Sequence, residues 1–183
     1  MKVFAMAGSV RAQSFNKKLL ALAVSQLQAA GAEVDVYDLK AANLQQYDAD
    51  IEVTSGLPAV VVDLKERIAK ADGLLLVSPE YNYSIPGVLK NAIDWASRPP
   101  ATNPFKGKLV AQMGATTGQG GTLQAQSAIR HIMVGCMAWS LPGWFVVSKA
   151  QEAFDEQGQL KDAAQKEQLV KFLKRFLDEL KGG

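Results

Sequence analysis

The sequence predicts an α/β fold in which a five-stranded parallel sheet carries helices on both faces. First, short apolar runs alternate along the chain with segments of helical apolar spacing, which is the pattern of βαβ units. Second, most of these runs are continuous rather than alternating, as expected for strands buried on both faces. Third, the 183 residues contain no internal repeat, low-complexity segment or dividing linker, which predicts a single domain over residues 1–183.

Breaking residues mark the limits of the predicted strands. The first continuous run ends at Gly8, and the third is broken by Pro79. The second segment alternates apolar and polar residues, which indicates a strand nearer the edge of the sheet. The five predicted strands cover residues 3–7, 34–39, 74–77, 109–113 and 144–147.

The predicted helices lie between these strands and after the last one. The first ends at Gly31, and the second has Pro58 near its first turn, where proline is tolerated. The final helix carries an apolar stripe of the kind that faces a core. The predicted helices cover residues 19–27, 57–71, 86–96 and 122–133, and the final stripe consists of Leu169, Phe172, Leu173, Phe176, Leu177 and Leu180.

Composition excludes several classes of function. Lys and Arg total 20 against 18 for Asp and Glu, and this net charge of +2 gives no reason to expect a nucleic-acid partner. The single cysteine, Cys136, cannot form an internal disulfide, and we expect it to be a small core residue. The single histidine, His131, provides no His-rich metal site and no spare base for a hydrolase triad, so we expect it on a helix surface or in packing.

The uncharged stretch over residues 132–147 is shorter than the roughly 20 residues that a membrane span needs. Gly135 and Pro142 also interrupt it, so a buried helix, a turn and a strand are expected there. The apolar run near Met1 is too short for the hydrophobic core of a signal peptide. The sequence therefore predicts a cytoplasmic protein with no membrane partner.

Three loops that follow predicted strands carry the candidate site, because open parallel sheets bind ligands beyond the carboxyl ends of their strands. The first, residues 8–16, combines hydroxyls, an amide and the guanidinium of Arg11 at the start of a helix, which suits a phosphate. The alternative is an ordinary capping loop formed by Ser14 and Asn16. The loop lacks the P-loop and dinucleotide-binding patterns, so it favours a monophosphate group.

The second and third loops indicate a flat ligand. Residues 78–87 place two tyrosines, an amide and a carboxylate between two stiffening prolines, although a plain surface turn remains the alternative. Residues 114–121 are rich in glycine and would allow close approach of the backbone to a ligand. Together the three loops fit a ligand with one phosphate and one flat polar heterocycle, for which FMN is the obvious candidate.

The sequence also resembles the NADPH-dependent FMN reductase family, which includes quinone, chromate and azo-dye reductases. The resemblance rests on Gly8-Ser9-x-Arg11-x-x-Ser14-x-Asn16, on Pro79-Glu80-Tyr81-Asn82 and on the run over residues 84–95. It covers essentially the whole chain in the order of strands and helices. It implies a flavodoxin-like three-layer sandwich whose five-stranded parallel sheet has the order 2-1-3-4-5.

The resemblance further implies which residues hold FMN. The phosphate group would be held by residues of the first loop and the amides between them: Ser9, Arg11, Ser14, Phe15 and Asn16. The edge of the isoalloxazine ring would be lined by Pro79, Glu80, Tyr81 and Asn82, and the ring or ribityl chain would lie near Thr116, Thr117 and Gly118.

No side chain is expected to act as a catalytic group and no metal is expected, because a flavin accepts hydride itself. For Glu80 we expect a structural role in which the backbone matters more than the side chain. Relatives often carry an arginine after the glycine pair of the third loop, whereas Thr122-Leu123-Gln124 follow here. The choice between NADPH and NADH therefore stays open.

The resulting prediction is an FMN-dependent NAD(P)H oxidoreductase that reduces a quinone, free flavin, chromate or an azo dye by a ping-pong mechanism. The resemblance implies a homodimer or homotetramer with the flavin pocket near a neighbouring chain, and Trp95, Trp139 and Trp144 could belong to the core or to a subunit interface. One alternative is a flavodoxin-type electron carrier without NAD(P)H activity, although such carriers are usually strongly acidic. The other is a flavodoxin-like interaction module that has lost its flavin, which the intact phosphate loop disfavours.

Overall fold

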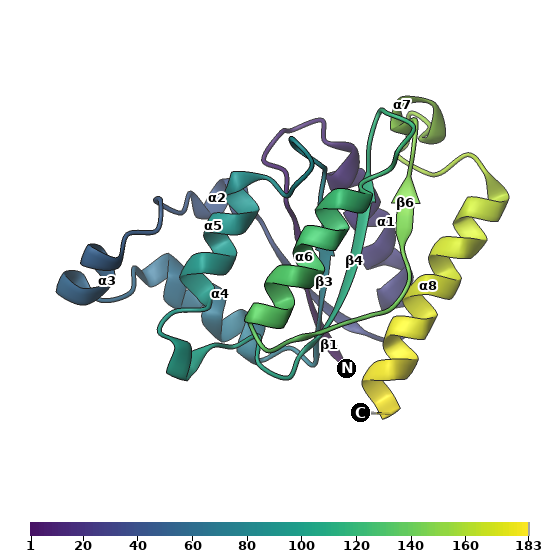
Figure 1. Cartoon of the computed structure of the whole chain (residues 1–183). Helices are drawn as coiled ribbons and strands as arrows, with labels where there is room; N and C mark the ends of the chain where they lie inside the picture. Colours follow the sequence, from purple (N-terminus) through teal and green to yellow (C-terminus); the bar gives the residue numbers. More distant parts are fainter. Residues whose placement is uncertain (183) are drawn as a thin grey trace.

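The computed structural model describes residues 1–182 and shows a parallel sheet covered by helices on both faces (Figure 1). Its strands run in the order β2-β1-β3-β4-β5, and β6 also pairs with β4, which confirms the predicted order 2-1-3-4-5. The strands are β1 (Lys2–Ala7), β2 (Glu33–Tyr37), β3 (Gly73–Val77), β4 (Leu109–Ala115), β5 (Trp139–Ser140) and β6 (Phe145–Val147).

The far edge of the sheet is divided where one strand was expected. Both β5 and β6 pair in parallel with β4, with Trp139 opposite Leu109 and Phe145 opposite Met113. Pro142, which has no amide hydrogen, lies in the interruption between them. The prediction over residues 144–147 found β6 and missed β5, because a two-residue strand is too short to show a period of its own.

The helices are α1 (Phe15–Ala29), α4 (Ala59–Ala69), α5 (Gly87–Ala96), α6 (Leu123–Gly135) and α8 (Ala163–Gly182), with the short α2 (Leu39–Ala42), α3 (Ala49–Ser55), α7 (Ala150–Ala153) and the 3₁₀ turn η1 (Pro100–Thr102). The helix predicted from residue 57 begins two residues later, because Pro58 is extended and precedes the first turn. Leu39, predicted to belong to the second strand, instead begins α2, where the Asp38 carboxylate accepts a hydrogen bond of 2.8 Å from the Lys40 amide.

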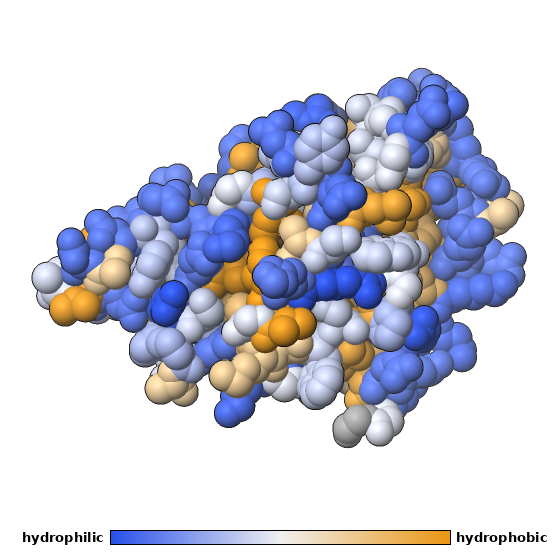
Figure 2. All heavy atoms as spheres, viewed as in Figure 1, coloured by the Kyte–Doolittle hydropathy of each residue, from blue (hydrophilic) through white to orange (hydrophobic). Residues whose placement is uncertain are grey.

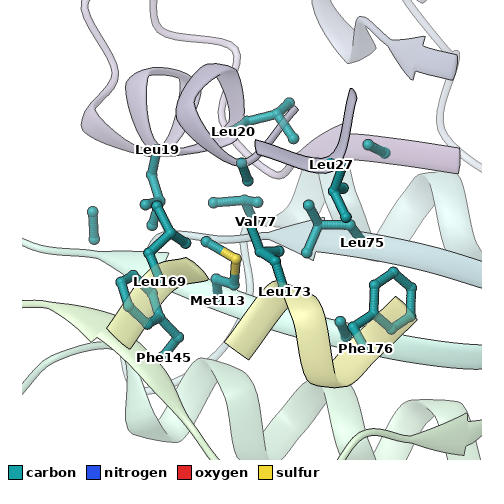
Figure 3. Packing of buried hydrophobic residues seen from close by; sticks show 14 of the residues in the cluster. Leu19, Leu20, Leu27, Leu75, Val77, Met113, Phe145, Leu169, Leu173 and Phe176 are labelled. Carbon is teal, nitrogen blue, oxygen red and sulfur yellow. The ribbon is translucent and has the colours of Figure 1, made fainter. Parts of the chain in front are cut away.

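Alternate residues of the central strands enter two separate cores. On β1, Val3 and Ala5 face α1 and α8, whereas Phe4 and Met6 face the layer that contains α4, α5 and α6. Figure 3 shows the first core, in which leucines of α1 meet Leu173 and Phe176 of α8 across the side chains of β3 and β4. The predicted stripe of the final helix is therefore its core-facing side. Three layers result, and the sheet is the middle one.

The segment weighed as a membrane span forms the end of α6, then β5 and β6. Within residues 1–182, no helix combines the length and the apolar character needed to cross a bilayer. Cys136 is buried, as predicted, and burial raises the pKa of its thiol. His131 lies exposed on α6, which agrees with the expected place on a helix surface.

The three tryptophans have different surroundings. Trp95 is fully buried in the layer of α5, and its indole N–H donates a hydrogen bond of 2.8 Å to the Gln45 carbonyl. Trp139 and Trp144 are largely exposed, so the core role considered for them is wrong. The reason is their position: β5 is at the edge of the sheet, and Trp144 lies in the interruption before β6.

Candidate functional site

The loops after β1, β3 and β4 meet at the carboxyl edge of the sheet and enclose a cavity of about 190 Å³. Ten of the twelve predicted site residues line this cavity; Asn82 and Gly118 do not. Ala115, at the end of β4, also lines it and was not among the residues predicted from the sequence. The complete lining consists of Ser9, Arg11, Ser14, Phe15, Asn16, Pro79, Glu80, Tyr81, Ala115, Thr116 and Thr117.

Gly8, between β1 and the first loop, lies very close to the side chains of Leu89 and Ser78. Its amide donates a hydrogen bond of 2.8 Å to the Val77 carbonyl, so the chain still runs beside β3 at this point. A Cβ at Gly8 would lie 2.9 Å from Leu89 Cδ2 and 3.0 Å from Ser78 Oγ, closer than ordinary contacts. The absence of a side chain therefore allows the end of β1 to pack closely against Leu89 and Ser78.

Ser9 follows directly and carries an unsatisfied hydroxyl. The residue is only 2% exposed, and its Oγ has no hydrogen-bond partner among the residues that the structure describes. Buried polar atoms are almost always paired, so an orphan hydroxyl in the wall of a cavity indicates a polar ligand there.

The amino terminus of α1 opens onto the same wall. Ser14 caps the helix, with its Oγ accepting a hydrogen bond of 3.2 Å from the Asn16 amide, so the capping alternative holds for Ser14. Its hydroxyl hydrogen is still available to a ligand. The exposed Arg11 lies in the lining beside the positive end of the helix dipole. Hydroxyls, helix amides and a guanidinium together favour an anion.

Asn16 connects the first and third loops. Its side-chain amide donates a hydrogen bond of 2.8 Å to the Ala115 carbonyl and accepts one of 2.8 Å from the Ala115 amide. This reciprocal pair fixes the first turn of α1 against the end of β4. The Asn16 side chain is thus engaged with the protein, which is a different use from the phosphate contact expected of it.

The second loop turns sharply beside the cavity. Tyr81 and Ser84 exchange backbone hydrogen bonds of 2.9 and 3.0 Å, and the two residues between them have positive φ angles of 49° for Asn82 and 63° for Tyr83. Positive φ at both central positions is the geometry of a type I′ turn. Tyr81 lines the cavity at the base of this turn, while Asn82 at its tip does not.

Glu80 links the second loop to α6. Its Oε2 accepts hydrogen bonds of 2.9 Å from the Gln124 amide and 3.2 Å from the Ala125 amide, in the first turn of the helix. The preceding Thr122 makes no side-chain cap, and its Oγ1 accepts a hydrogen bond of 3.2 Å from Gln126 Nε2. Glu80 thus has a structural contact, as expected, but its carboxylate makes that contact, whereas the prediction gave the larger part to its backbone.

The third loop begins at a glycine that nothing larger could replace. A Cβ at Gly114 would lie 1.9 Å from Thr122 Oγ1 and 2.5 Å from the Ser78 carbonyl oxygen. Beyond it, Thr116 donates its amide hydrogen to the Val147 carbonyl at 2.9 Å and accepts from the Gly118 amide through Oγ1 at 3.2 Å. These bonds hold Thr116 in the lining and leave Gly118 outside it.

The chain matches the family model of the NADPH-dependent FMN reductases over residues 1–152. It is 40% identical to an NAD(P)H-dependent FMN reductase of Pseudomonas aeruginosa, over all of this chain and 98% of that protein. It is 41% identical to a quinone reductase of Escherichia coli, over 73% of this chain and 70% of that one.

Among solved structures, the flavoenzyme NAD(P)H:(acceptor) oxidoreductase FerB of Paracoccus denitrificans superposes with a TM-score of 0.86. The two chains are 30% identical, and the match covers 99% of this chain and 97% of that one. The order of the sheet, the residues gathered in the cavity and these matches agree, and the chain belongs to the NADPH-dependent FMN reductase family.

Proposed function

We propose that this protein is an FMN-dependent NAD(P)H oxidoreductase that binds the flavin in the cavity at the carboxyl edge of the sheet. The observation that carries the proposal is the unpaired, buried Ser9 hydroxyl beside the amino terminus of α1 and the guanidinium of Arg11. Membership of the family confirms the expected oxidoreductase class and the expected use of FMN and NAD(P)H. The assignment of individual residues to parts of FMN is our own.

The first loop fits the phosphate group. Ser9 Oγ, the hydroxyl hydrogen of Ser14 and the Arg11 guanidinium can each donate a hydrogen bond to a phosphate oxygen, and the amino terminus of α1 adds its dipole. Asn16 contributes by holding Ala115 and thereby the spacing between the first and third loops.

The second and third loops fit the ring and the ribityl chain. Pro79 and Tyr81 form one side of the cavity, and Thr116 and Thr117 form part of another. Glu80 fixes the second loop to the first turn of α6, the helix that follows the third loop in the chain. Polar groups at fixed positions orient a flat ligand, and a fixed ligand lets donor and acceptor meet the same reactive atom at a reproducible distance.

Bound FMN would supply the redox chemistry by accepting a hydride from NAD(P)H and passing the electrons to an acceptor. We propose that donor and acceptor use the same cavity and enter it in turn, as in a ping-pong mechanism. Initial rates measured at several fixed NADPH concentrations should then give parallel double-reciprocal lines. Intersecting lines would indicate a complex that contains both substrates.

Small planar molecules are the proposed acceptors. Quinones come first, because the E. coli relative is named a quinone reductase, and free flavin follows, because the P. aeruginosa relative is named an FMN reductase. We propose chromate and azo dyes as further acceptors. We also propose that the chain assembles as a homodimer or homotetramer.

The test is an absorbance spectrum of the purified protein before and after anaerobic addition of NADPH. We expect the bands of oxidised flavin, taken up from added FMN if necessary, and we expect NADPH to bleach them. Flavin that binds but does not bleach with NADPH or NADH would favour the electron carrier, for which the net charge of +2 offers no support. Protein that binds no FMN would overturn the proposed site.

A further inference from the structure

We propose that Lys149 binds the 2′-phosphate of NADPH and makes this protein prefer NADPH to NADH as its electron donor. The inference rests on the proposed function, because it concerns the nucleotide that reduces bound FMN. Lys149 lies two residues after β6 and immediately before α7. It was not among the site residues predicted from the sequence.

The segment that contains Lys149 holds the third loop in place. The carbonyls of four successive loop residues, 116 to 119, all accept hydrogen bonds from residues 148–151. The Lys149 amide donates one of them, a bond of 3.0 Å to the Gly118 carbonyl. Thr116 and Thr117, the two residues before Gly118, line the cavity. The backbone of Lys149 is therefore fixed at the rim of the cavity.

The backbone conformation of Lys149 is uncommon for a lysine. Its φ and ψ angles, both 47°, lie in the left-handed region, which residues with a side chain rarely adopt. Glycine or asparagine would fit this position with less strain. Strained residues persist where the surrounding structure holds them, and they concentrate at binding sites. The conformation therefore favours a function for the Lys149 side chain.

The ammonium group of Lys149 is available to a ligand. The residue is exposed, and within residues 1–182 no carboxylate oxygen lies within 4.0 Å of its Nζ. The two lysines in the first turn of α1 are engaged within the protein. Lys17 Nζ lies 3.8 Å from Asp38 Oδ1, and Lys18 Nζ lies 5.5 Å from the centre of the Phe15 ring. Lysine binds phosphate as a point charge, which suits an unpaired ammonium group.

The loops at this edge of the sheet carry two cations for two phosphate-bearing ligands. Residues 8–14, 78–86, 116–122 and 148–149 follow β1, β3, β4 and β6, and they contain Arg11 and Lys149 and no further lysine or arginine. The order β1-β3-β4-β6 separates the strand ends that carry them by three strand spacings, about 14 Å. This separation suits two phosphate groups better than one. Since Arg11 is proposed for the phosphate of FMN, Lys149 remains for a phosphate of the donor.

The 2′-phosphate is the phosphate of NADPH that fits this position. Hydride transfer requires the nicotinamide ring to lie against the flavin, inside the cavity. The rest of the dinucleotide then extends outward past the rim, and the 2′-phosphate belongs to the ribose farther from the nicotinamide. A phosphate monoester carries about 1.5 to 2 negative charges near pH 7, more than either phosphate of the linking pyrophosphate. The attraction to a single ammonium group is therefore largest for the 2′-phosphate.

The surface beside Lys149 is open to a dinucleotide. Figure 2 shows blue and pale atoms at the top of the molecule, where Figure 1 places α7 beside the loop that follows β4. Residues 116–122 include no carboxylate that would repel a phosphate. Among the described residues, no atom lies within 4 Å of the position that a Cβ at Gly120 would take. A ligand can thus approach the backbone of the third loop closely on its way to Lys149.

The experiment measures the binding of NADP⁺ and of NAD⁺ to FMN-loaded protein by titration calorimetry at low ionic strength. We expect wild type to bind NADP⁺ at least about 10-fold more tightly than NAD⁺, because a hydrogen bond to a charged group changes affinity by that factor or more. Lys149→Gln removes the charge, so the two dissociation constants should become equal through weaker binding of NADP⁺. Lys149→Arg should retain the preference.

Lys106→Gln is the matched control. Lys106 is also exposed and has no carboxylate oxygen within 4.0 Å among residues 1–182. It precedes β4 and therefore lies at the opposite edge of the sheet from the cavity. This variant should keep the wild-type preference for NADP⁺. The FMN content of each variant verifies that it folds.

Three results would overturn the assignment of Lys149. They are equal binding of both nucleotides by wild type, an unchanged preference in Lys149→Gln, and an equal loss of affinity for NADP⁺ and NAD⁺ in that variant. The last result would place Lys149 beside a phosphate that both nucleotides share. Wild-type protein that prefers NADP⁺ but is not bleached by NADPH would support the phosphate site and contradict the proposed function, so the two failures are distinguishable.

Discussion

Glu80 and Gln124 are joined across two loops of the site, with Glu80 Oε2 accepting a hydrogen bond of 2.9 Å from the Gln124 amide. The same oxygen accepts from the Ala125 amide, so one carboxylate serves as the cap of α6 although it comes from a distant loop. Pro79 and Tyr81 flank it in the sequence and line the cavity. A displacement of the Glu80 carboxylate should therefore affect both the second loop, which lines the cavity, and the first turn of α6.

Replacing Glu80 should weaken both the fold and flavin binding. Glu80→Ala removes the cap and leaves two amides unpaired, which should lower the free energy of unfolding by about 1 kcal/mol. Glu80→Gln keeps an acceptor oxygen but loses the favourable charge at the helix terminus, so its effect should be about half as large. FMN affinity, measured by fluorescence titration, should fall in the same order, wild type above Gln above Ala.

Asp48→Ala is the matched control for Glu80. The Asp48 carboxylate caps α3 through the Asp50 amide at 2.9 Å, and Asp48 is not part of the cavity lining. It should lower the melting temperature while FMN affinity stays at the wild-type value. If Glu80→Ala also left FMN affinity unchanged, the carboxylate would be a helix cap without influence on the site.

In the flavin-free protein, replacing Ser9 or Ser14 by alanine should have different effects on the free energy of unfolding. Ser9→Ala removes a buried hydroxyl that has no hydrogen-bond partner within residues 1–182, so the free energy of unfolding should stay equal or rise by up to about 1 kcal/mol. Ser14→Ala removes the cap of α1 and should lower it by about 1 kcal/mol. Chemical denaturation of flavin-free protein measures both changes.

Both serine variants should bind FMN less tightly. A hydrogen bond to a charged group contributes about 1.5–3 kcal/mol, so the loss from Ser9→Ala should be roughly 10- to 100-fold in the dissociation constant. A Ser9→Ala protein with wild-type FMN affinity would show that the orphan hydroxyl does not meet the flavin.

Much of the fold could be predicted from the sequence, because buried parallel strands are continuous apolar runs with a breaking residue after them. Gly8 ends the first of these runs and Pro79 breaks the third, so the positions of two of the three site loops follow from the sequence. Segments stabilised by a single capping aspartate, such as α2 after Asp38 and α3 after Asp48, have too few residues to show a helical period and were missed. The two-residue β5 was missed for the same reason.

The site was predictable where side-chain type alone shows the chemistry and unpredictable where partners far apart in sequence decide it. Ser9 and Arg11 could be selected because their residue types alone show that they can donate hydrogen bonds to a phosphate. The bond between Glu80 and Gln124 spans 44 residues, and that between Asn16 and Ala115 spans 99, so no local pattern shows them. Ala115 contributes a backbone position to the lining, and its side chain gives no signal of that role.

Stability should depend on pH through Asp35 on β2. Arg67 donates a hydrogen bond of 3.0 Å from Nε to Asp35 Oδ2 and a second from Nη2 to Oδ1, and these hydrogen bonds hold the pKa of the Asp35 carboxyl below its usual value. A lowered pKa in the folded state stabilises the protein above the unfolded pKa of about 3.9. That stabilisation is lost as the pH falls through the lower, folded value.

Asp35→Asn measures this contribution. At pH 7 the free energy of unfolding of the variant should be about 1 kcal/mol lower than that of wild type. The difference is no larger because the ion pair is partly exposed to solvent. The difference between the two proteins should shrink below pH 4 and disappear at more acidic pH. A difference that stayed constant between pH 7 and pH 3 would show that the ionised pair contributes nothing.

Gly114 should be the least replaceable glycine of the site. Gly114→Ala would place Cβ 2.5 Å from the backbone oxygen of Ser78 and 1.9 Å from Thr122 Oγ1, and a backbone atom at the end of a strand cannot move away cheaply. The substitution should lower the free energy of unfolding by about 3 kcal/mol or more and separate the start of α6 from β4, so flavin binding should fail with it.

Gly87→Ala is the control. Gly87 begins α5, and among the described residues no atom lies within 4 Å of the position that its Cβ would take. It should stabilise the protein by about 0.5 kcal/mol by restricting the unfolded chain, with FMN affinity unchanged. Thermal unfolding of the two variants side by side distinguishes a steric requirement at Gly114 from a general sensitivity of this fold to loss of glycine, because the latter would make both variants unstable.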